Sequence, residues 1–267
     1  HALAWRLSIS PSVTKVYAIP GSAAMSDCAE LVGIDWQQIN HLIRFLKDNQ
    51  VDLVVVGPEA PLVAGLADAL NAAGIPVFGP SKAAAQLEGS KVFAKDLMKK
   101  YNIPTAAYGV FHKVDEAKEF IAQTGAPIVV KADGLAAGKG VVVAMTIEEA
   151  NAAVEDMLSG NRFGEAGSTV VIEEFMEGEE ASLLAFVDGK TVVPMIASQD
   201  HKRIFDGDKG PNTGGMGTYA PAPVLTDALR DEAMKTILEP MVAAMEKEGM
   251  PYVGCLYAAT IGSKIVF

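Results

Sequence analysis

Val129-Val-Lys-Ala-Asp-Gly-Leu-Ala-Ala-Gly-Lys-Gly-Val-Val-Val143 is the stretch of this chain that decides its fold. Runs of β-branched residues on both sides of a glycine-rich loop predict a β-hairpin. The stretch carries Lys131 and Lys139, and its glycines allow backbone N–H groups to approach phosphate oxygens. It is neither a Walker P-loop nor a dinucleotide fingerprint. The pattern favours a hairpin that closes over a triphosphate, and a glycine-rich turn with two solvated lysines is the alternative.

The composition limits the classes of protein to which the chain can belong. Its 267 residues, 50% of them hydrophobic, suffice for two or three subdomains. A net charge of −11 argues against a nucleic-acid binder, because affinity for a phosphate backbone needs clustered lysine and arginine. Cys28 and Cys255 lack metal-ligand spacing, so we expect neither a disulfide framework nor a zinc site, and a reducing cytoplasmic location. No apolar run reaches the roughly 18 residues of a membrane span, so no membrane association is expected.

The N-terminal part of the chain alternates strands and helices. Apolar patterns predict strands at 16–19, 51–57 and 75–78 and helices at 2–7, 36–49 and 62–73. The run at 51–57 is expected to be buried on both faces of a sheet. This order predicts an open parallel α/β sheet, in which ligands bind beyond the carboxyl ends of the strands. Pro20-Gly21-Ser22 and Gly57–Pro61 are therefore candidate binding loops.

The rest of the chain follows an α+β pattern. The predicted elements are a helix at 82–101, a strand at 108–111, a helix at 114–123, the glycine-rich hairpin, a helix at 147–158, a strand at 169–174, strands at 181–187 and 191–196 joined by Asp188-Gly189, a loop at 198–217, a helix at 227–247 and a strand pair within 254–267. No sequence repeat with a period of 20–50 residues is present.

An acidic segment after the strand at 169–174 is a candidate site for a nucleoside. The end of a strand at Glu173-Glu174-Phe175-Met176 would offer backbone N–H and C=O groups to the edge of adenine, with Phe175 and Met176 as apolar contacts. Glu180 would accept hydrogen bonds from ribose hydroxyls. An acidic turn with solvated carboxylates is the alternative.

The loop predicted at 198–217 concentrates charged and amide side chains. A structureless loop of this length inside a compact domain is usually functional or disordered. Arg203 would clamp a phosphate in fork geometry, and Asn212 would position a phosphate or a metal. His201 alone indicates no role.

Together these segments resemble the ATP-grasp ligases, in which a glycine-rich hairpin on a small subdomain covers ATP. The resemblance is closer to one family, the phosphoribosylamine-glycine ligases, also called glycinamide ribonucleotide synthetases. It spans the whole chain and rests on the motifs His1–Trp5, Gly57–Leu62, Phe78–Pro80, Gln86–Lys91, Lys131–Gly140, Phe163–Gly167, Glu173–Phe175, and Asp200–Arg203 with Gly210–Gly217.

The resemblance implies roles for individual residues. The catalytic residues would be Arg203 and Asn212. ATP would be bound by Lys91, Lys131, Gly138, Lys139, Gly140, Glu173, Glu174, Phe175, Met176, Glu180, Arg203 and Asn212. The other substrates would be bound by Pro20, Gly21, Glu59, Asp200, Lys202, Gly214 and Gly215.

The resemblance also implies a reaction. Glycine, 5-phosphoribosylamine and ATP would give glycinamide ribonucleotide, ADP and phosphate through glycyl phosphate, in purine biosynthesis. The implied cofactors are ATP and Mg²⁺ (or Mn²⁺), the partners are small molecules only, and we expect a monomer. The family's Glu-x-Asn metal pair has no counterpart in the sequence, so the metal ligands are unknown; Asp208 is one candidate oxygen donor.

The implied architecture has two domains. Residues 1–88 would form the N-terminal α/β substrate domain without the family's first strand, and residues 89–267 the ATP-grasp domain, with 108–172 as its small lid and without its C-terminal part. We expect the isolated fragment to be inactive. Two alternatives stay open: another ATP-grasp ligase of purine synthesis, such as a carboxylating enzyme that uses bicarbonate, and a nucleotide-binding module without turnover.

Overall fold

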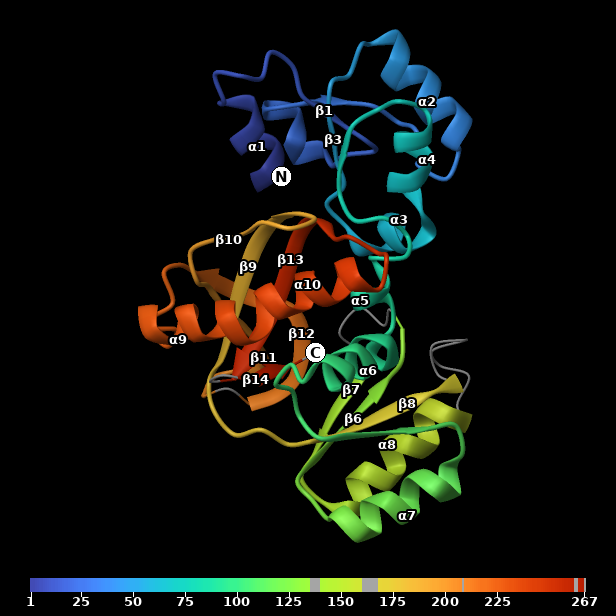
Figure 1. Ribbon diagram of the computed structural model, residues 1–267, viewed down its shortest axis with the longest axis vertical. Helices are drawn as coiled ribbons and strands as arrows, with labels where there is room; N and C mark the ends of the chain where they lie inside the picture. The colour runs from blue at the N-terminus through green and yellow to red at the C-terminus, as the bar shows by residue number, and fades with distance from the viewer. Residues whose placement is uncertain (135–139, 160–167, 208, 262–263, 267) are drawn as a thin grey trace. The chain divides into compact units, whose positions relative to one another are not determined.

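The structure, a computed structural model, describes residues 1–134, 140–159, 168–207, 209–261 and 264–266. The chain divides into two compact units, His1–Lys82 and Ala83–Phe267, each described here by itself (Figure 1). Within the described ranges, no helix combines the length and the apolar character that a membrane span requires. The domain limits expected at residues 88/89 and for a lid at 108–172 stay predictions.

The first unit contains two pairs of short parallel strands, which confirms the predicted α/β class. Strand β1 (Tyr17–Ala18) pairs with β2 (Glu30–Leu31), and β3 (Val54–Val55) pairs with β4 (Val77–Phe78). The helices are α1 (Ala2–Ser8), α2 (Ile39–Asp48), α3 (Glu59–Ala64) and α4 (Leu66–Ala72), with a short 3₁₀ segment at Ala23–Asp27. The core of the unit is formed by large apolar side chains, namely Ile34, Leu42, Leu46, Leu66, Leu70 and Ile75.

Two predictions for this unit are wrong, and one strand was not predicted. The expected single helix at 62–73 is two helices. Gly65 takes a left-handed conformation with φ +97°, which ends α3 before α4 begins. The run at 51–57 is a two-residue strand that is not buried on both faces, since Leu53 is 53% exposed. The strand at β2 was not predicted, because two residues are too few to show a period.

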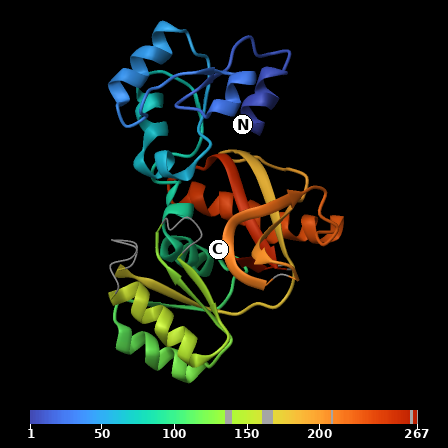
Figure 2. The same cartoon turned by 180° about the vertical axis from the view of Figure 1, so that it is seen from behind.

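The second unit begins with α5 (Gln86–Gly89) and α6 (Lys91–Tyr101), followed by a four-stranded antiparallel sheet. Its strands are β5 (Tyr108–Phe111), β6 (Ile128–Ala132), β7 (Val141–Ala144) and β8 (Val170–Glu174), in the order β5-β8-β6-β7. The pairing of β6 with β7 confirms the predicted hairpin. Helices α7 (Val114–Thr124) and α8 (Ile147–Ser159) lie side by side against one face of this sheet (Figures 1 and 2).

Alternation along the strands assigns side chains to the two faces of this sheet. Val130 and Ile172 pack into the core beneath α7 and α8. Their neighbours Lys131 and Glu173 therefore point to the opposite face, because successive side chains of a strand point to opposite faces. This opposite face carries the charged groups of the candidate site.

A second four-stranded sheet has the order β10-β9-β13-β14. Its strands are β9 (Glu180–Asp188), β10 (Val192–Pro194), β13 (Val253–Ile261) and β14 (Lys264–Val266). One continuous helical stretch comprises α9 (Asp227–Ala233), a π segment (Met234–Leu238) and α10 (Glu239–Lys247). Pro240 has no N–H to donate to the carbonyl of Thr236, which accounts for the widened turn. This stretch and α6 bury one face of the sheet in the largest core of the protein.

Two further predictions for the second unit are wrong. The expected loop at 198–217 is an antiparallel pair, β11 (Gln199–Phe205) and β12 (Lys209–Tyr219), with register shifts between His201 and Phe205. The expected helix at 82–101 is interrupted at Ser90, which is extended and caps α6 by accepting a hydrogen bond from the Phe93 N–H at 3.1 Å.

Candidate functional site

A buried cluster of one carboxylate and two ammonium groups lies where α6 meets the charged face of the β5-β8-β6-β7 sheet. The Nζ atoms of Lys95 and Lys131 each lie 3.1 Å from Oε2 of Glu173. The side chains of Lys95, Lys131 and Glu173 are 0%, 2% and 2% exposed, respectively. Charges buried this deeply need partners, so the three groups depend on one another.

The strand register explains how this cluster forms. In the β6–β8 pair, Val129 lies opposite Glu173 and Lys131 lies opposite Val171, so Lys131 and Glu173 are diagonal neighbours on one face. Lys95 enters from α6, where it follows Lys91 by one helical turn and shares its face.

Lys91 lies beside this cluster at the start of α6. Its ammonium donates to the carbonyl of Gly134 at 2.9 Å, next to the glycine-rich segment. Burial lowers the pKa of Lys91, and the neighbouring charge of Lys131 lowers it further. Burial also lowers the pKa of Lys95, with the charge of Glu173 acting in the opposite direction. Two ammonium groups share Oε2 of Glu173, and Lys91 lies near Lys131 with the carboxylate of Asp133 also beside it. Such a concentration of lysines suits an anionic ligand.

Asp133 fixes the end of β6 to the start of α6. Its carboxylate accepts hydrogen bonds from the Ser90 hydroxyl at 3.2 and 3.3 Å and from the Val92 N–H at 3.2 Å. Ser90 and Val92 are the chain neighbours of Lys91, and Asp133 lies two residues after Lys131. These hydrogen bonds therefore hold Lys91 and Lys131 near each other.

The other oxygen of Glu173, Oε1, is buried and has no hydrogen-bond partner among the residues that the structure describes. An unsatisfied buried acceptor costs about 1–3 kcal/mol unless a ligand or water supplies a donor. Glu174, the last residue of β8, instead accepts from the Ala107 N–H at 3.2 Å and is exposed, and Phe175 and Met176 follow it half-buried.

A second cluster of charged side chains lies at the start of β9. Lys202 on β11 donates to Oε1 of Glu180 at 2.6 Å, and its Nζ lies 3.9 Å from Oδ2 of Asp200. Burial acts to lower the pKa of Lys202, but the hydrogen bond with Glu180 and the charges of Tyr257, Glu180 and Asp200 together outweigh burial, so the pKa is raised. The structure thus brings together three predicted site residues, with Glu180 already engaged by a cation.

Arg203 and Asn212 meet in the β11–β12 pair, where their backbones lie opposite each other. Nη1 of Arg203 donates to the carbonyl of Gly210 at 3.0 Å. The side chain of Asn212 lies outside the described part, as do Gly138, Lys139 and Asp208. Gly140 is buried, and its carbonyl accepts from the Ala132 N–H at 2.8 Å. Gly214 and Gly215 lie exposed on β12.

The predicted residues of the first unit are Pro20, Gly21 and Glu59. Gly21 has φ +74°, and a Cβ there would lie 2.8 Å from Cδ2 of Leu31, so the turn requires glycine. Glu59 is exposed in the first turn of α3, where a carboxylate complements the helix dipole.

Lys95 and Asp133 were not among the predicted site residues. Lys95 could have been found from the sequence, because it follows the candidate Lys91 by four residues in a predicted helix and positions i and i+4 lie on one face. Asp133 lies within the quoted hairpin, but its contact with α6 is not visible from local sequence. Among the described residues, no group of three or more His, Cys, Asp or Glu side chains is arranged to hold a metal ion.

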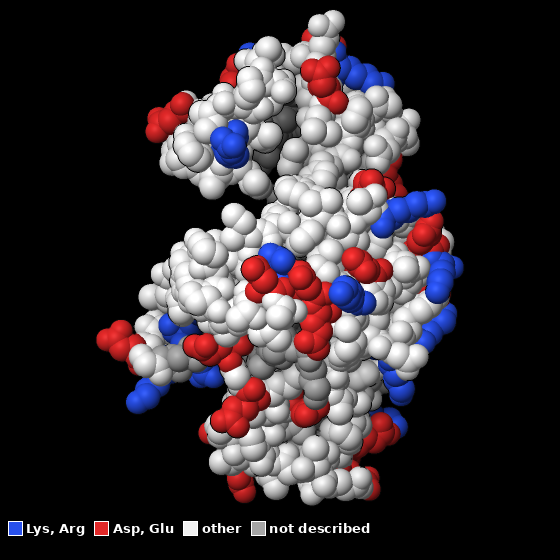
Figure 3. Space-filling view, turned by 60° about the vertical axis from the view of Figure 1, so that its left-hand side comes forward, with Lys and Arg blue, Asp and Glu red and all other residues white. Residues whose placement is uncertain are grey.

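Surface charge contrasts with the buried lysines. Figure 3 shows acidic side chains gathered in groups on the visible face, with basic side chains between them. The net charge of −11 is therefore compatible with a positive interior site, because the cations of that site are buried rather than displayed.

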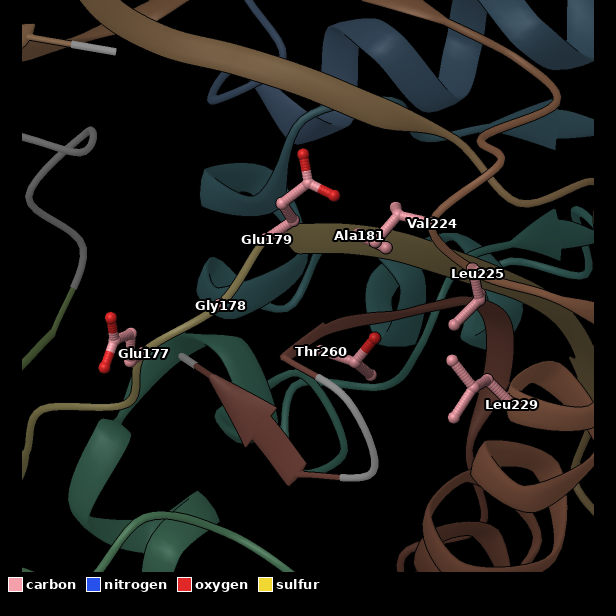
Figure 4. A pocket seen from close by; sticks show the side chains of 8 residues that line it. All are labelled: Glu177, Gly178, Glu179, Ala181, Val224, Leu225, Leu229 and Thr260. Carbon is pink, nitrogen blue, oxygen red and sulfur yellow. The ribbon is translucent and has the colours of Figure 1, made fainter.

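A separate pocket of about 330 Å³ is lined in part by residues 177–179, which connect β8 to β9. Figure 4 shows Glu177, Ala181, Leu229 and Thr260 around it. Ala181 and Thr260 are paired in register and lie on the core face of the second sheet, opposite to that of Glu180. Among the described residues, the lining includes the carboxylates of Glu177 and Glu179 and no cation, so this pocket does not suit a phosphate.

The two-unit α/β and α+β architecture with its glycine-rich hairpin is that of the ATP-grasp class. The solved structure of phosphoribosylamine-glycine ligase from Thermotoga maritima matches 98% of this chain and 62% of its own, with a TM-score of 0.84 and 32% identity. N5-carboxyaminoimidazole ribonucleotide synthetase from Thermus thermophilus matches with a TM-score of 0.66 at 22% identity, which supports the fold alone. The fold class predicted from the sequence is confirmed.

Residues 1–88 match the N domain of phosphoribosylglycinamide synthetase, and residues 89–264 match its ATP-grasp (A) domain. The chain belongs to the phosphoribosylglycinamide synthetase family. Phosphoribosylamine-glycine ligase of Vibrio cholerae is 54% identical over 260 residues, 97% of this chain and 61% of the relative, and that of Agrobacterium fabrum is 55% identical over 258 residues. The chain spans about three fifths of the length of these relatives, and the predicted family is confirmed.

Proposed function

We propose that this chain belongs to an ATP-dependent carbon-nitrogen ligase that joins glycine to 5-phosphoribosylamine in purine biosynthesis. The single observation that carries the proposal is the buried cluster of Lys95, Lys131 and Glu173, with Lys91 beside it, in a chain that matches this family over both units. Clustered, desolvated cations stabilise a polyphosphate more strongly than solvated ones do.

The residues fit a nucleotide triphosphate. Lys91 and Lys131 would hold its phosphates, since both flank the glycine-rich segment. The unpartnered Oε1 of Glu173 would accept from an amino group such as that of adenine. Glu180 would accept from ribose hydroxyls, with Phe175 and Met176 beside the base.

The chemistry follows from this arrangement. ATP would supply a phosphoryl group to the glycine carboxylate, and the amine of phosphoribosylamine would then displace phosphate from glycyl phosphate. The residues of this chain would align the substrates, neutralise phosphate charge and exclude water. Arg203 and Asn212 would act at the phosphate end, where a guanidinium binds two oxygens at once. Asp200, Lys202, Gly214 and Gly215 would contribute to the glycine pocket, and Pro20, Gly21 and Glu59 would bind phosphoribosylamine.

A divalent cation, Mg²⁺ or Mn²⁺, belongs to the proposal only as a cofactor. The described residues offer no ready-made set of ligands for it, so no step is assigned to the metal. A cytoplasmic location is proposed as well, since Cys28 and Cys255 are both free thiols in the structure, as reducing conditions would leave them. The monomer expected from the family resemblance is kept as part of the proposal.

The test is phosphate release from ATP by the natural full-length protein with Mg²⁺, with glycine and phosphoribosylamine supplied separately and together. Release that needs both substrates, and that falls at least tenfold in Lys131→Met, supports the proposal. Lys113→Met is the matched control, because Lys113 is 75% exposed and forms an ion pair with Glu116 three residues further along the chain. Release that depends on bicarbonate and another ribonucleotide would indicate a carboxylating ligase, and ATP binding without release would indicate a binding module.

A further inference from the structure

The shared carboxylate oxygen of Glu173 raises a question of charge balance. Lys131 lies at the end of β6, beside the glycine-rich segment, and donates to Oε2 of Glu173 at 3.1 Å. A lysine that holds a phosphate must direct its ammonium at that phosphate. When Lys131 does so, Glu173 loses one of the two cations that neutralise it.

A buried carboxylate cannot readily lose its cation. Breaking a buried ion pair by removing one partner is strongly destabilising, because it leaves an uncompensated charge in a region of low dielectric constant. Glu173 is 2% exposed, so water offers no replacement. If Lys131 were its only partner, Glu173 would compete with the ligand for that ammonium.

Lys95 removes this competition. Its ammonium lies 3.1 Å from the same Oε2 and donates to Oγ1 of Thr105 at 2.7 Å, so it is held from two sides. It is fully buried on α6 and also lies 5.8 Å from the centre of the Tyr108 ring. These contacts involve protein groups rather than the glycine-rich segment, and they would persist when Lys131 moves.

We propose that Lys95 is a positioning residue that keeps Glu173 neutralised, and so frees Lys131 to bind the phosphates of the nucleotide. The inference rests on the proposed function, because it assumes that Lys131 binds a phosphate. It adds a residue that acts through Glu173 without touching the ligand. In its absence, Glu173 would hold Lys131 by charge and nucleotide affinity would fall.

The experiment measures the dissociation constants of ATP and of adenosine by titration calorimetry and competition, using the natural full-length protein. Lys95→Met is expected to weaken ATP binding at least tenfold, and to change adenosine binding less than threefold, because adenosine has no phosphate for Lys131. In Lys95→Met/Glu173→Gln the carboxylate charge that retains Lys131 is gone. This double variant is expected to bind ATP at least fivefold more tightly than Lys95→Met.

The recovery in the double variant separates positioning from structural damage, since a second substitution in a damaged core would weaken binding further. Lys99→Met is the matched control on the same helix, because Lys99 is exposed, and it is expected to bind ATP like the unsubstituted chain. Circular dichroism identifies folded variants. If Lys95→Met does not fold, Lys95→Gln replaces it in both the single and the double variant, since glutamine keeps an N–H donor without the charge.

Unchanged ATP affinity in Lys95→Met, equal weakening of ATP and adenosine, or no recovery in the double variant would each overturn the inference while leaving the proposed function intact. Absence of ATP binding by the unsubstituted chain would instead remove the proposed function, and this inference with it.

Discussion

Replacing Glu173 by alanine should destabilise the second unit strongly, because it leaves Lys95 and Lys131 without their shared anion. Both ammonium groups are 2% exposed or less, so solvent cannot compensate. Removing one partner of a buried ion pair costs about 3–5 kcal/mol. Here one substitution leaves two buried cations without their shared carboxylate. The free energy of unfolding should therefore fall by at least about 3–5 kcal/mol, which corresponds to a decrease in Tm of roughly 6–20 °C for a unit of this size.

The loss should also depend on pH in a definite direction. Burial already lowers the pKa of Lys95, and Glu173 opposes that shift, so the variant should have a still lower pKa in the folded state. Protonated lysine then disfavours folding at every pH below this folded-state pKa. The penalty should diminish as the pH rises from there toward the unfolded value of about 10.4. The difference in stability from the unsubstituted protein should be smaller at pH 10 than at pH 7.

Urea unfolding followed by circular dichroism at the two pH values measures both effects. Glu248→Ala is the control, since Glu248 forms an ion pair with Lys100 at 2.6 Å whose side chains are 27% and 61% exposed. Exposed pairs contribute little because water screens them, so this variant should lose far less stability. The reasoning is refuted if Glu173→Ala loses no more than Glu248→Ala, or if its loss is the same at both pH values.

Three other predictions concern single residues. ATP binding should take up protons at a pH between the lowered pKa of Lys91 and its ordinary value, because burial and Lys131 lower that pKa in the free protein and phosphate charge would raise it. Calorimetry in two buffers should show this uptake, and its persistence in Lys91→Met would contradict the assignment. Glu180→Ala should reduce the preference for ATP over 2′-deoxy-ATP at least threefold, and an unchanged ratio of dissociation constants would exclude the ribose contact. Gly210→Ala should lower the free energy of unfolding by about 1–2 kcal/mol, since its φ is +83°, whereas Gly214→Ala, which has open space for a Cβ, should be neutral in the same melts.

Elements with a strong local period were predictable from the sequence. The β-branched runs of β6 and β7 predict their hairpin, and α7 and α8 were expected within one residue of their observed ends. Each of these signals lies within one segment of the chain, where spacing alone separates the buried face from the exposed face. The same alternation places Lys131 and Glu173 on one face of the sheet once the strands and their register are known.

Elements whose pairing lies outside the local pattern were not predictable. The strands β11 and β12 contain glycines, charged residues and a proline, all of low strand propensity, and they form because each satisfies the backbone of the other. The break at Ser90 was missed because the flanking residues continue a helical pattern, while the serine cap and the carboxylate of Asp133 act across the chain.

The site shows the same division between local and distant signals. Lys91 on α6 and Lys131 on β6 were visible as candidates. Lys95 was missed, because the dependence of Lys95 and Lys131 on Glu173 is set by packing between α6 and the sheet. That packing desolvates the lysines when the chain folds, so a nucleotide would meet cations that have already lost their water. Folding must then stabilise this arrangement without the ligand, which requires a buried anion. The carboxylate of Glu173 supplies that negative charge, but it would also retain Lys131 when the nucleotide needs this lysine. The ammonium of Lys95, on the same oxygen, neutralises Glu173 and so leaves Lys131 available.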